Sequence, residues 1–230
     1  MKKQFIKIGA IPAIVWGNAS DRVYLFVHGK LSCKEAAEDF AAIAEKKGFQ
    51  VISFDLPSHG ERKSDAERCD IWNGIRDLRI VSEYVFARWA HVLLYGCSLG
   101  AFFALHAYAD MAFEKCLFQS PIVDMVYLIQ QMMVWFGVSE ERLAREGEVD
   151  TPIDILSQKY YEYVLEHPIE KWGFPTEILY GSRDTLQSRE VLECFAARFG
   201  CRLVVAEGCD HPFMADAERL VVDSWLRESI

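Results

Sequence analysis

Short apolar runs alternate with amphipathic stretches along most of the chain. Residues 22–27, 51–54 and 91–95 are almost continuously apolar, as expected of strands buried on both faces of a parallel sheet. Residues 4–8 and 11–16 flank a Gly-Ala pair and predict an opening hairpin. Further strands are predicted at 115–118, 176–180 and 201–206, and helices at 34–47, 70–88, 99–109, 188–199 and 213–228. The alternation predicts an α/β fold with helices on both faces of a mostly parallel sheet.

The segment from residue 121 to 172 departs from this alternation. Its first part, Asp124 to Phe136, is almost wholly apolar, and a charged stretch follows at 139–150. Thr151 and Pro152 then predict the start of a second helix, because threonine caps helices and proline suits the first helical position. Two helices inserted between strands suggest a cap over the sheet. An ordinary helical hairpin packed against the sheet is the alternative.

The composition is that of one soluble globular domain with a modest insertion. The chain has 230 residues, of which 51% are hydrophobic and 26% charged, and this excludes a disordered or fibrous chain. It contains 25 Lys and Arg residues and 34 Asp and Glu residues, which gives a net charge of −9. We therefore expect no nucleic-acid partner, since phosphate backbones bind basic surfaces. No stretch approaches ~18 uninterrupted apolar residues, so we expect no membrane partner.

The cysteines bear on the cellular compartment. There are seven, scattered along the chain, and none forms a C-x-x-C pair. Several lie inside apolar runs, as Cys116 and Cys201 do. This usage is typical of reduced, mostly buried thiols and predicts a cytoplasmic protein.

The strongest chemical signal is the pentapeptide Gly96-Cys97-Ser98-Leu99-Gly100. It follows a predicted strand and opens a predicted helix, which is the context of a nucleophile elbow. A serine on such a sharp turn is held with its hydroxyl exposed, and the flanking glycines, Gly96 and Gly100, avoid clashes where the backbone passes closely. We therefore predict Ser98 as a nucleophile. The structural alternative is a tight strand-to-helix turn with an inert serine.

A nucleophilic serine needs a base, and the base needs an acid that orients it. His211 follows the predicted strand 201–206, and Asp184 follows the predicted strand 176–180. Because the carboxyl ends of parallel strands line one crevice, both can converge on Ser98. Asp124 and Asp210 are the competing candidates for the acid. Asp210 adjoins His211 and would have to fold back to orient it.

Other histidines and one lysine have different expected roles. His28 and His59 precede glycines in turns at strand ends, and we expect them to brace those loops. The backbone N–H groups of Leu99 and Lys30 are the predicted donors of an oxyanion hole, since Gly29 lets the Lys30 loop curl toward the serine. The Lys30 ammonium is expected to be solvated, with contact to an anionic substrate group as the alternative.

Five motifs together resemble the α/β-hydrolase superfamily, and small lidded esterases and serine-peptidase-like members in particular. The motifs are Val27–Lys30, Asp55–Arg62, Gly96–Gly100, Gly181–Asp184 and Asp210–Phe213. The resemblance implies an eight-stranded sheet with the hairpin at one edge and a helical cap after the sixth strand. The core is then 1–120 and 173–230, and the cap 121–172. It also implies the chain order Ser98, Asp184, His211. Ser58 and Arg62 depart from the usual second motif, in a structural turn.

These observations predict a serine hydrolase that cleaves a small or medium acyl ester or thioester through an acyl-enzyme intermediate. The expected partner is a small-molecule acyl substrate. We expect no metal and no organic cofactor, because no ligand motif is present. An amidase or peptidase with the same three residues and a non-catalytic ligand-binding protein remain alternatives. Within the insertion, Met125, Met132, Trp135 and Phe136 are predicted to line the substrate pocket, and the same segment is a candidate homodimer contact.

Overall fold

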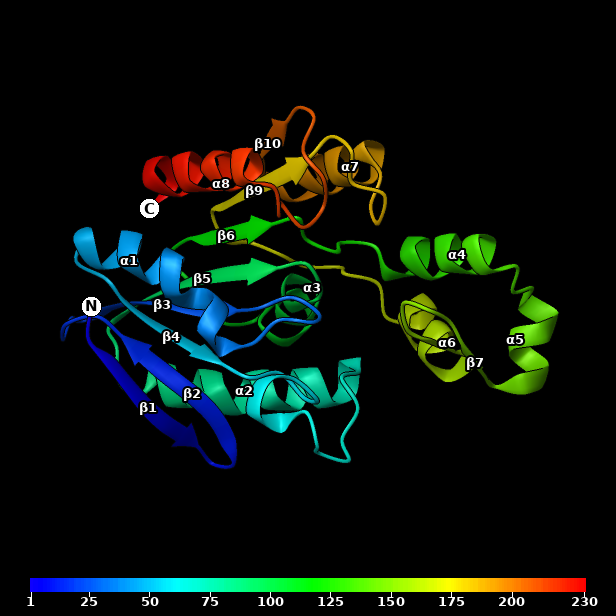
Figure 1. The fold of residues 1–230 in the computed structure, drawn as a ribbon, viewed down its shortest axis with the longest axis horizontal. Coiled ribbons are helices and arrows are strands. Elements are labelled where there is room, and N and C mark those ends of the chain that lie inside the picture. The colour runs from blue at the N-terminus through cyan, green and yellow to red at the C-terminus, as the bar shows by residue number, and fades with distance from the viewer.

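The computed structural model describes residues 1–230, and its centre is an eight-stranded sheet (Figure 1). The strands lie in the order β1-β2-β4-β3-β5-β6-β9-β10. The first hairpin, β1 with β2, and the pair β2 with β4 are antiparallel, and all other neighbours are parallel. The predicted fold class is confirmed, with the hairpin at one edge. The strands are β1 (Lys3–Ile8), β2 (Ile11–Trp16), β3 (Arg22–Val27), β4 (Gln50–Phe54), β5 (His91–Cys97), β6 (Cys116–Gln119), β9 (Thr176–Gly181) and β10 (Arg202–Ala206).

Helices cover both faces of this sheet, as Figure 1 shows. One face carries α1 (Glu38–Lys46) and α8 (Asp216–Ser229). The other carries α2 (Ile71–Phe86), α3 (Leu99–Ala107) and α7 (Arg189–Phe199). Two short 3-10 turns precede helices, η1 (Lys34–Ala37) and η2 (Gly60–Arg62).

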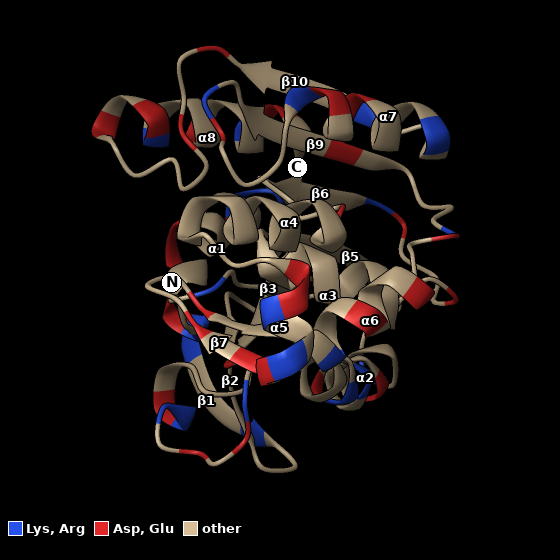
Figure 2. Cartoon of the chain, turned by 90° about the vertical axis from the view of Figure 1, so that its right-hand side faces the viewer, with Lys and Arg blue, Asp and Glu red and all other residues tan.

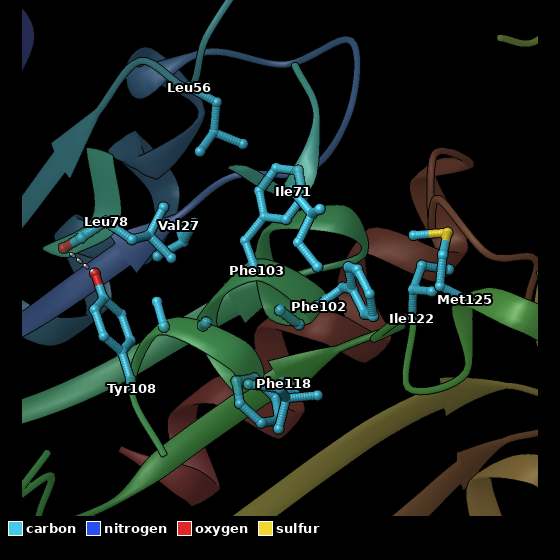
Figure 3. Packing of buried hydrophobic residues seen from close by; sticks show 14 of the residues in the cluster. Val27, Leu56, Ile71, Leu78, Phe102, Phe103, Tyr108, Phe118, Ile122 and Met125 are labelled. Carbon is cyan, nitrogen blue, oxygen red and sulfur yellow. Dashed lines mark hydrogen bonds between the residues drawn. The ribbon is translucent and has the colours of Figure 1, made fainter. Parts of the chain in front are cut away.

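The two faces have separate hydrophobic clusters because side chains alternate along each strand. In β3, Tyr24 and Phe26 pack with α1, whereas Val23, Leu25 and Val27 belong to the cluster beneath α2 and α3. Figure 3 shows that second cluster, with Phe102 and Phe103 of α3 at its centre, and Tyr108 donates a hydrogen bond to the Leu78 carbonyl there. The densely packed cluster fixes the end of β5 and the start of α3, where Ser98 lies.

The segment between β6 and β9 differs in part from the predicted helical pair. It contains α4 (Met125–Phe136), α5 (Glu140–Glu146), the strands β7 (Glu148–Asp150) and β8 (Ile155–Ser157), and α6 (Gln158–Glu166). The helix start predicted at Thr151 is wrong. The Thr151 hydroxyl accepts the Asp154 N–H at 3.1 Å and so closes the turn between β7 and β8. Ser157 caps α6 instead, accepting the Tyr160 N–H.

This segment projects from the carboxyl ends of the strands, beyond the sheet in Figure 1. In Figure 2, α4 carries no charged residue, whereas α5 carries both signs. The inner face of α4 joins the main core through Met125, Ile129 and Met132, which are all buried in the cluster beneath α3. Val134 and Trp135, near the end of the helix, are exposed. No helix in the structure combines the length and the apolarity that crossing a membrane requires.

Candidate active site

Ser98 occupies the turn between β5 and α3 in a strained backbone conformation. Its φ is 48° and its ψ −119°, a combination that a non-glycine residue rarely adopts. A Cβ at Gly100 would lie 2.3 Å from the His28 carbonyl oxygen, and one at Gly96 would lie 3.0 Å from the Ala101 Cα. Gly100 therefore requires glycine, Gly96 leaves little room for a side chain, and the close packing holds the turn in its strained form.

The structure brings Ser98, His211 and Asp184 into one hydrogen-bonded row. The Ser98 Oγ lies 2.8 Å from the His211 Nε2, and the His211 Nδ1 lies 2.6 Å from the Asp184 Oδ2. The Asp184 side chain is almost fully buried, and its other oxygen accepts the N–H groups of Leu186 and Gln187 at 2.7 and 3.3 Å. This carboxylate can hold the imidazole with Nδ1 protonated, so that Nε2 is free to accept the serine proton.

The competing carboxylates are engaged elsewhere. Asp124 caps α4 by accepting the Tyr127 N–H, and Asp210 pairs with Arg183 at 2.9 Å. Neither makes a hydrogen bond to His211, so Asp184 is the only carboxylate in the row.

Two residues that the sequence did not single out hold the His211 loop. The Ser120 hydroxyl donates to the His211 carbonyl at 2.7 Å. The buried Glu218 accepts the N–H groups of Asp210 and Ala215 at 2.8 and 3.1 Å, so that it closes the loop on both sides of the histidine. Both contacts join residues that are distant along the sequence or lie across a loop, and no local pattern signals them.

Two backbone N–H groups beside Ser98 donate no hydrogen bond within the protein. They belong to Leu99, the first residue of α3, and to Lys30. The Lys30 loop approaches the serine because Gly29 allows it: a Cβ there would lie 3.2 Å from the Ser98 Cβ. These are the two donors predicted for an oxyanion hole. The Lys30 ammonium forms an ion pair with Asp154, at the turn between β7 and β8.

The Lys30 loop is braced by two histidines, as expected. The buried His28 donates through Nδ1 to the Gly29 carbonyl and accepts the Leu56 N–H at Nε2. His59 accepts the Leu31 N–H and donates to the Pro57 carbonyl. Burial lowers the pKa of His28 to about 4, so this ring is neutral near pH 7 and acts as a fixed donor and acceptor.

The departures from the family's second motif are accommodated by the turn itself. Ser58 has a φ of 59°, the left-handed conformation that favours glycine, and its hydroxyl donates to the Glu67 carbonyl. Arg62 is buried and forms ion pairs with Asp65, Glu67 and Asp77. Both residues support a structural turn and neither lies in the row of Ser98.

A cavity of about 110 Å³ opens beside Ser98. Its lining includes Leu99, Lys30 and one stripe of α4. Of the four residues predicted to line the substrate pocket, Met125, Met132 and Trp135 line this cavity and Phe136 does not; its ring packs against the main hydrophobic cluster. A larger hollow of about 480 Å³ between α4, α6 and α7 does not include Ser98.

The Cys97 thiol, next to Ser98 in the chain, is not an activated nucleophile. Burial raises the pKa of the Cys97 thiol to about 12, so this neighbour of Ser98 stays protonated and poorly nucleophilic. None of the seven cysteines is paired, and Cys194 is exposed rather than buried. No three or more His, Cys, Asp or Glu side chains are arranged to hold a metal ion.

The fold and this row define a candidate nucleophilic-serine site at the carboxyl ends of a parallel sheet. The model of the Alpha/beta hydrolase family matches residues 24–223, and the chain belongs to this family. Family membership indicates a hydrolase. A comparison with curated protein sequences found no significant match.

Solved structures resemble the whole chain. Est1E from Butyrivibrio proteoclasticus, with ferulic acid bound, has a TM-score of 0.78 at 17% identity, covering 98% of this chain and 96% of its own. Mouse alpha/beta hydrolase domain-containing protein 10 has a TM-score of 0.78 at 16% identity, covering 99% and 98%. The Pyrococcus furiosus esterase PF2001 has a TM-score of 0.72 at 20% identity, covering 99% and 89%. At these identities the likeness is one of fold.

Proposed function

We propose that this chain is a serine hydrolase that cleaves short acyl esters or thioesters through an acyl-enzyme intermediate. The observation that carries the proposal is the unbroken row from Ser98 to Asp184, placed beside two unused N–H donors and a cavity. Each element has one role in acyl transfer, and together they supply all the roles that the reaction requires.

In the proposed mechanism, the Ser98 Oγ attacks the substrate carbonyl while His211 removes its proton at Nε2. The carbonyl oxygen becomes negative and is stabilised by the N–H groups of Leu99 and Lys30. Asp184 stabilises the imidazolium that forms. His211 then protonates the leaving alcohol or thiol, and the C–O or C–S bond breaks. Water repeats the sequence and releases the acid from Ser98.

The cavity supports a short acyl group. An apolar cavity of ~150 Å³ is known to hold a benzene molecule, and the volume beside Ser98 is about 110 Å³. We therefore infer that the acyl half has only a few carbon atoms, at the small end of the size range that the sequence predicts.

The test is a set of chromogenic acyl esters of two to ten carbons, measured with wild type, Ser98→Ala and Cys97→Ala. We expect the highest kcat/KM at two to four carbons, a loss of about 10³-fold or more in Ser98→Ala, and near-normal rates in Cys97→Ala. Cys97 is the matched control, since it lies in the same turn as Ser98 but outside the hydrogen-bonded row of Ser98, His211 and Asp184. Full activity in Ser98→Ala would refute the mechanism.

A further inference from the structure

Exposed apolar side chains surround the mouth of the Ser98 cavity. Trp135 of α4, Ile153 of the turn between β7 and β8, and Ile155 of β8 line the cavity, yet they are 40%, 47% and 38% exposed. We call these three residues the collar. They belong to different elements and all line this cavity, so their exposure is a property of this site rather than of one helix.

The ion pair of Lys30 with Asp154 places the collar next to the reacting atoms. Asp154 lies between Ile153 and Ile155, and Lys30 carries one of the two N–H donors beside Ser98. Leu31, the next residue, is 90% exposed and adds apolar surface to the same loop. A molecule that reacts at Ser98 and extends out of the cavity passes beside these side chains.

The cavity is too small for both halves of an ester. Its volume of about 110 Å³ accommodates a few carbon atoms, so either the acyl half or the alcohol half must lie outside. His211 is not part of the cavity lining, although it must protonate the leaving group in the proposed mechanism. The alcohol half is therefore the half that lies outside the cavity.

We propose that the collar binds the alcohol or thiol half of the substrate, and that this half is apolar. The inference rests on the proposed function and adds a substrate class to it: short acyl esters of alkyl or aromatic alcohols. Exposed large apolar groups cluster on proteins where ligands or partners bind. The chain's net charge of −9 further disfavours an anionic alcohol half.

The experiment varies the two halves separately, with the acid released measured by titration at constant pH. One series holds the acyl group as butyrate and lengthens the alcohol from methyl to hexyl, because these alcohols have similar intrinsic reactivity. The second series keeps the alcohol half as methanol and lengthens the acyl group. Each methylene that becomes fully buried is expected to raise kcat/KM roughly fourfold. A methylene on the open collar gains about half of that free energy, so it should raise kcat/KM roughly twofold.

The variants are Trp135→Ser and Ile153→Ser, with Val134→Ser as the matched control. Val134 precedes Trp135 on the same helix and is 75% exposed, but it does not line the cavity. We expect the collar variants to flatten the dependence on alcohol length, and Val134→Ser to leave the dependence unchanged.

An unchanged dependence on alcohol length in both collar variants would overturn the inference but leave the proposed function intact. A collar effect on the acyl series alone would also overturn it, because the acyl half would then lie on the collar. Hydrolysis that persists in Ser98→Ala, or no hydrolysis of any ester, would instead refute the proposed function and the inference with it.

Discussion

Glu218 is expected to determine both the stability of the His211 loop and the rate of the reaction. Its two carboxylate oxygens accept the N–H groups of Asp210 and Ala215, one on each side of the histidine. The side chain is 9% exposed, and Arg183 lies 3.7 Å away. Replacing Glu218 with alanine removes both acceptors while leaving Ser98, His211 and Asp184 unchanged.

The size of the effect follows from these contacts. A hydrogen bond to a charged group contributes ~1.5–3 kcal/mol, but Asp210 and Ala215 are exposed, so water can replace part of each bond. We therefore expect Glu218→Ala to lower the free energy of unfolding by about 2 kcal/mol. Glu218→Gln keeps one acceptor and should cost about half as much. Displacement of His211 by ~1 Å should reduce kcat by about 10- to 100-fold.

The assay combines urea unfolding with ester hydrolysis for each variant. Asp216→Asn is the matched control, because Asp216 lies in the first turn of the same helix and makes no side-chain hydrogen bond. We expect this control to change both quantities little. An alanine variant within 0.5 kcal/mol of wild type, with an unchanged kcat, would refute the role assigned to Glu218.

Three further predictions concern single side chains. Tyr160→Phe should raise the free energy of unfolding by about 1 kcal/mol, because the buried Tyr160 hydroxyl has no hydrogen-bond partner. The control Tyr161→Phe should lower the free energy of unfolding, since the Tyr161 hydroxyl accepts a hydrogen bond from Gln130 at 3.0 Å. Equal urea midpoints for the two variants would contradict this. Glu177→Gln should flatten the loss of stability in acid. Burial raises the Glu177 pKa, but hydrogen-bond donors on Ser229, Trp225 and Arg202 outweigh burial and lower the pKa overall. The stabilisation by the Glu177 carboxylate is therefore present above the unfolded-state pKa of ~4.3 and is lost as pH falls through the lower folded-state pKa. Parallel stability curves of wild type and Glu177→Gln from pH 7 to 3 would contradict this. Lys30→Ala should retain kcat within about threefold, because the backbone N–H proposed to stabilise the oxyanion remains; a 100-fold loss would assign a role to the ammonium.

The sheet and its order of elements could be predicted because hydrophobic periodicity and turn residues are local. The apolar run at 91–95 and the glycines that follow it indicate a buried strand and a sharp turn before any contact is known. The structure brings Ser98, His211 and Asp184 together as the spacing suggests. The two predicted oxyanion donors are backbone groups, so they could be proposed from their positions alone.

The insertion was harder to predict, because its residues acquire their roles from tertiary contacts. Thr151 followed by proline has the sequence of a helix cap, but its hydroxyl closes a turn in a small hairpin. Phe136 lies on the same apolar stripe of α4 as Met125 and Met132, yet it packs against the main cluster without lining the cavity. Glu218 and Ser120 belong to no sequence motif. Each forms hydrogen bonds to the His211 loop, which lies far away along the chain or across a turn. A cytoplasmic location and a dimer contact through the insertion stay predictions.

The central claim is that Ser98 is an activated nucleophile. Its most direct test is the intact mass of the protein after brief exposure to a fluorophosphonate, followed by peptide mapping. The account predicts the addition of one phosphonyl group at Ser98 in wild type and in Cys97→Ala, and none in Ser98→Ala. An unmodified wild type, or a group attached to another residue, would contradict it.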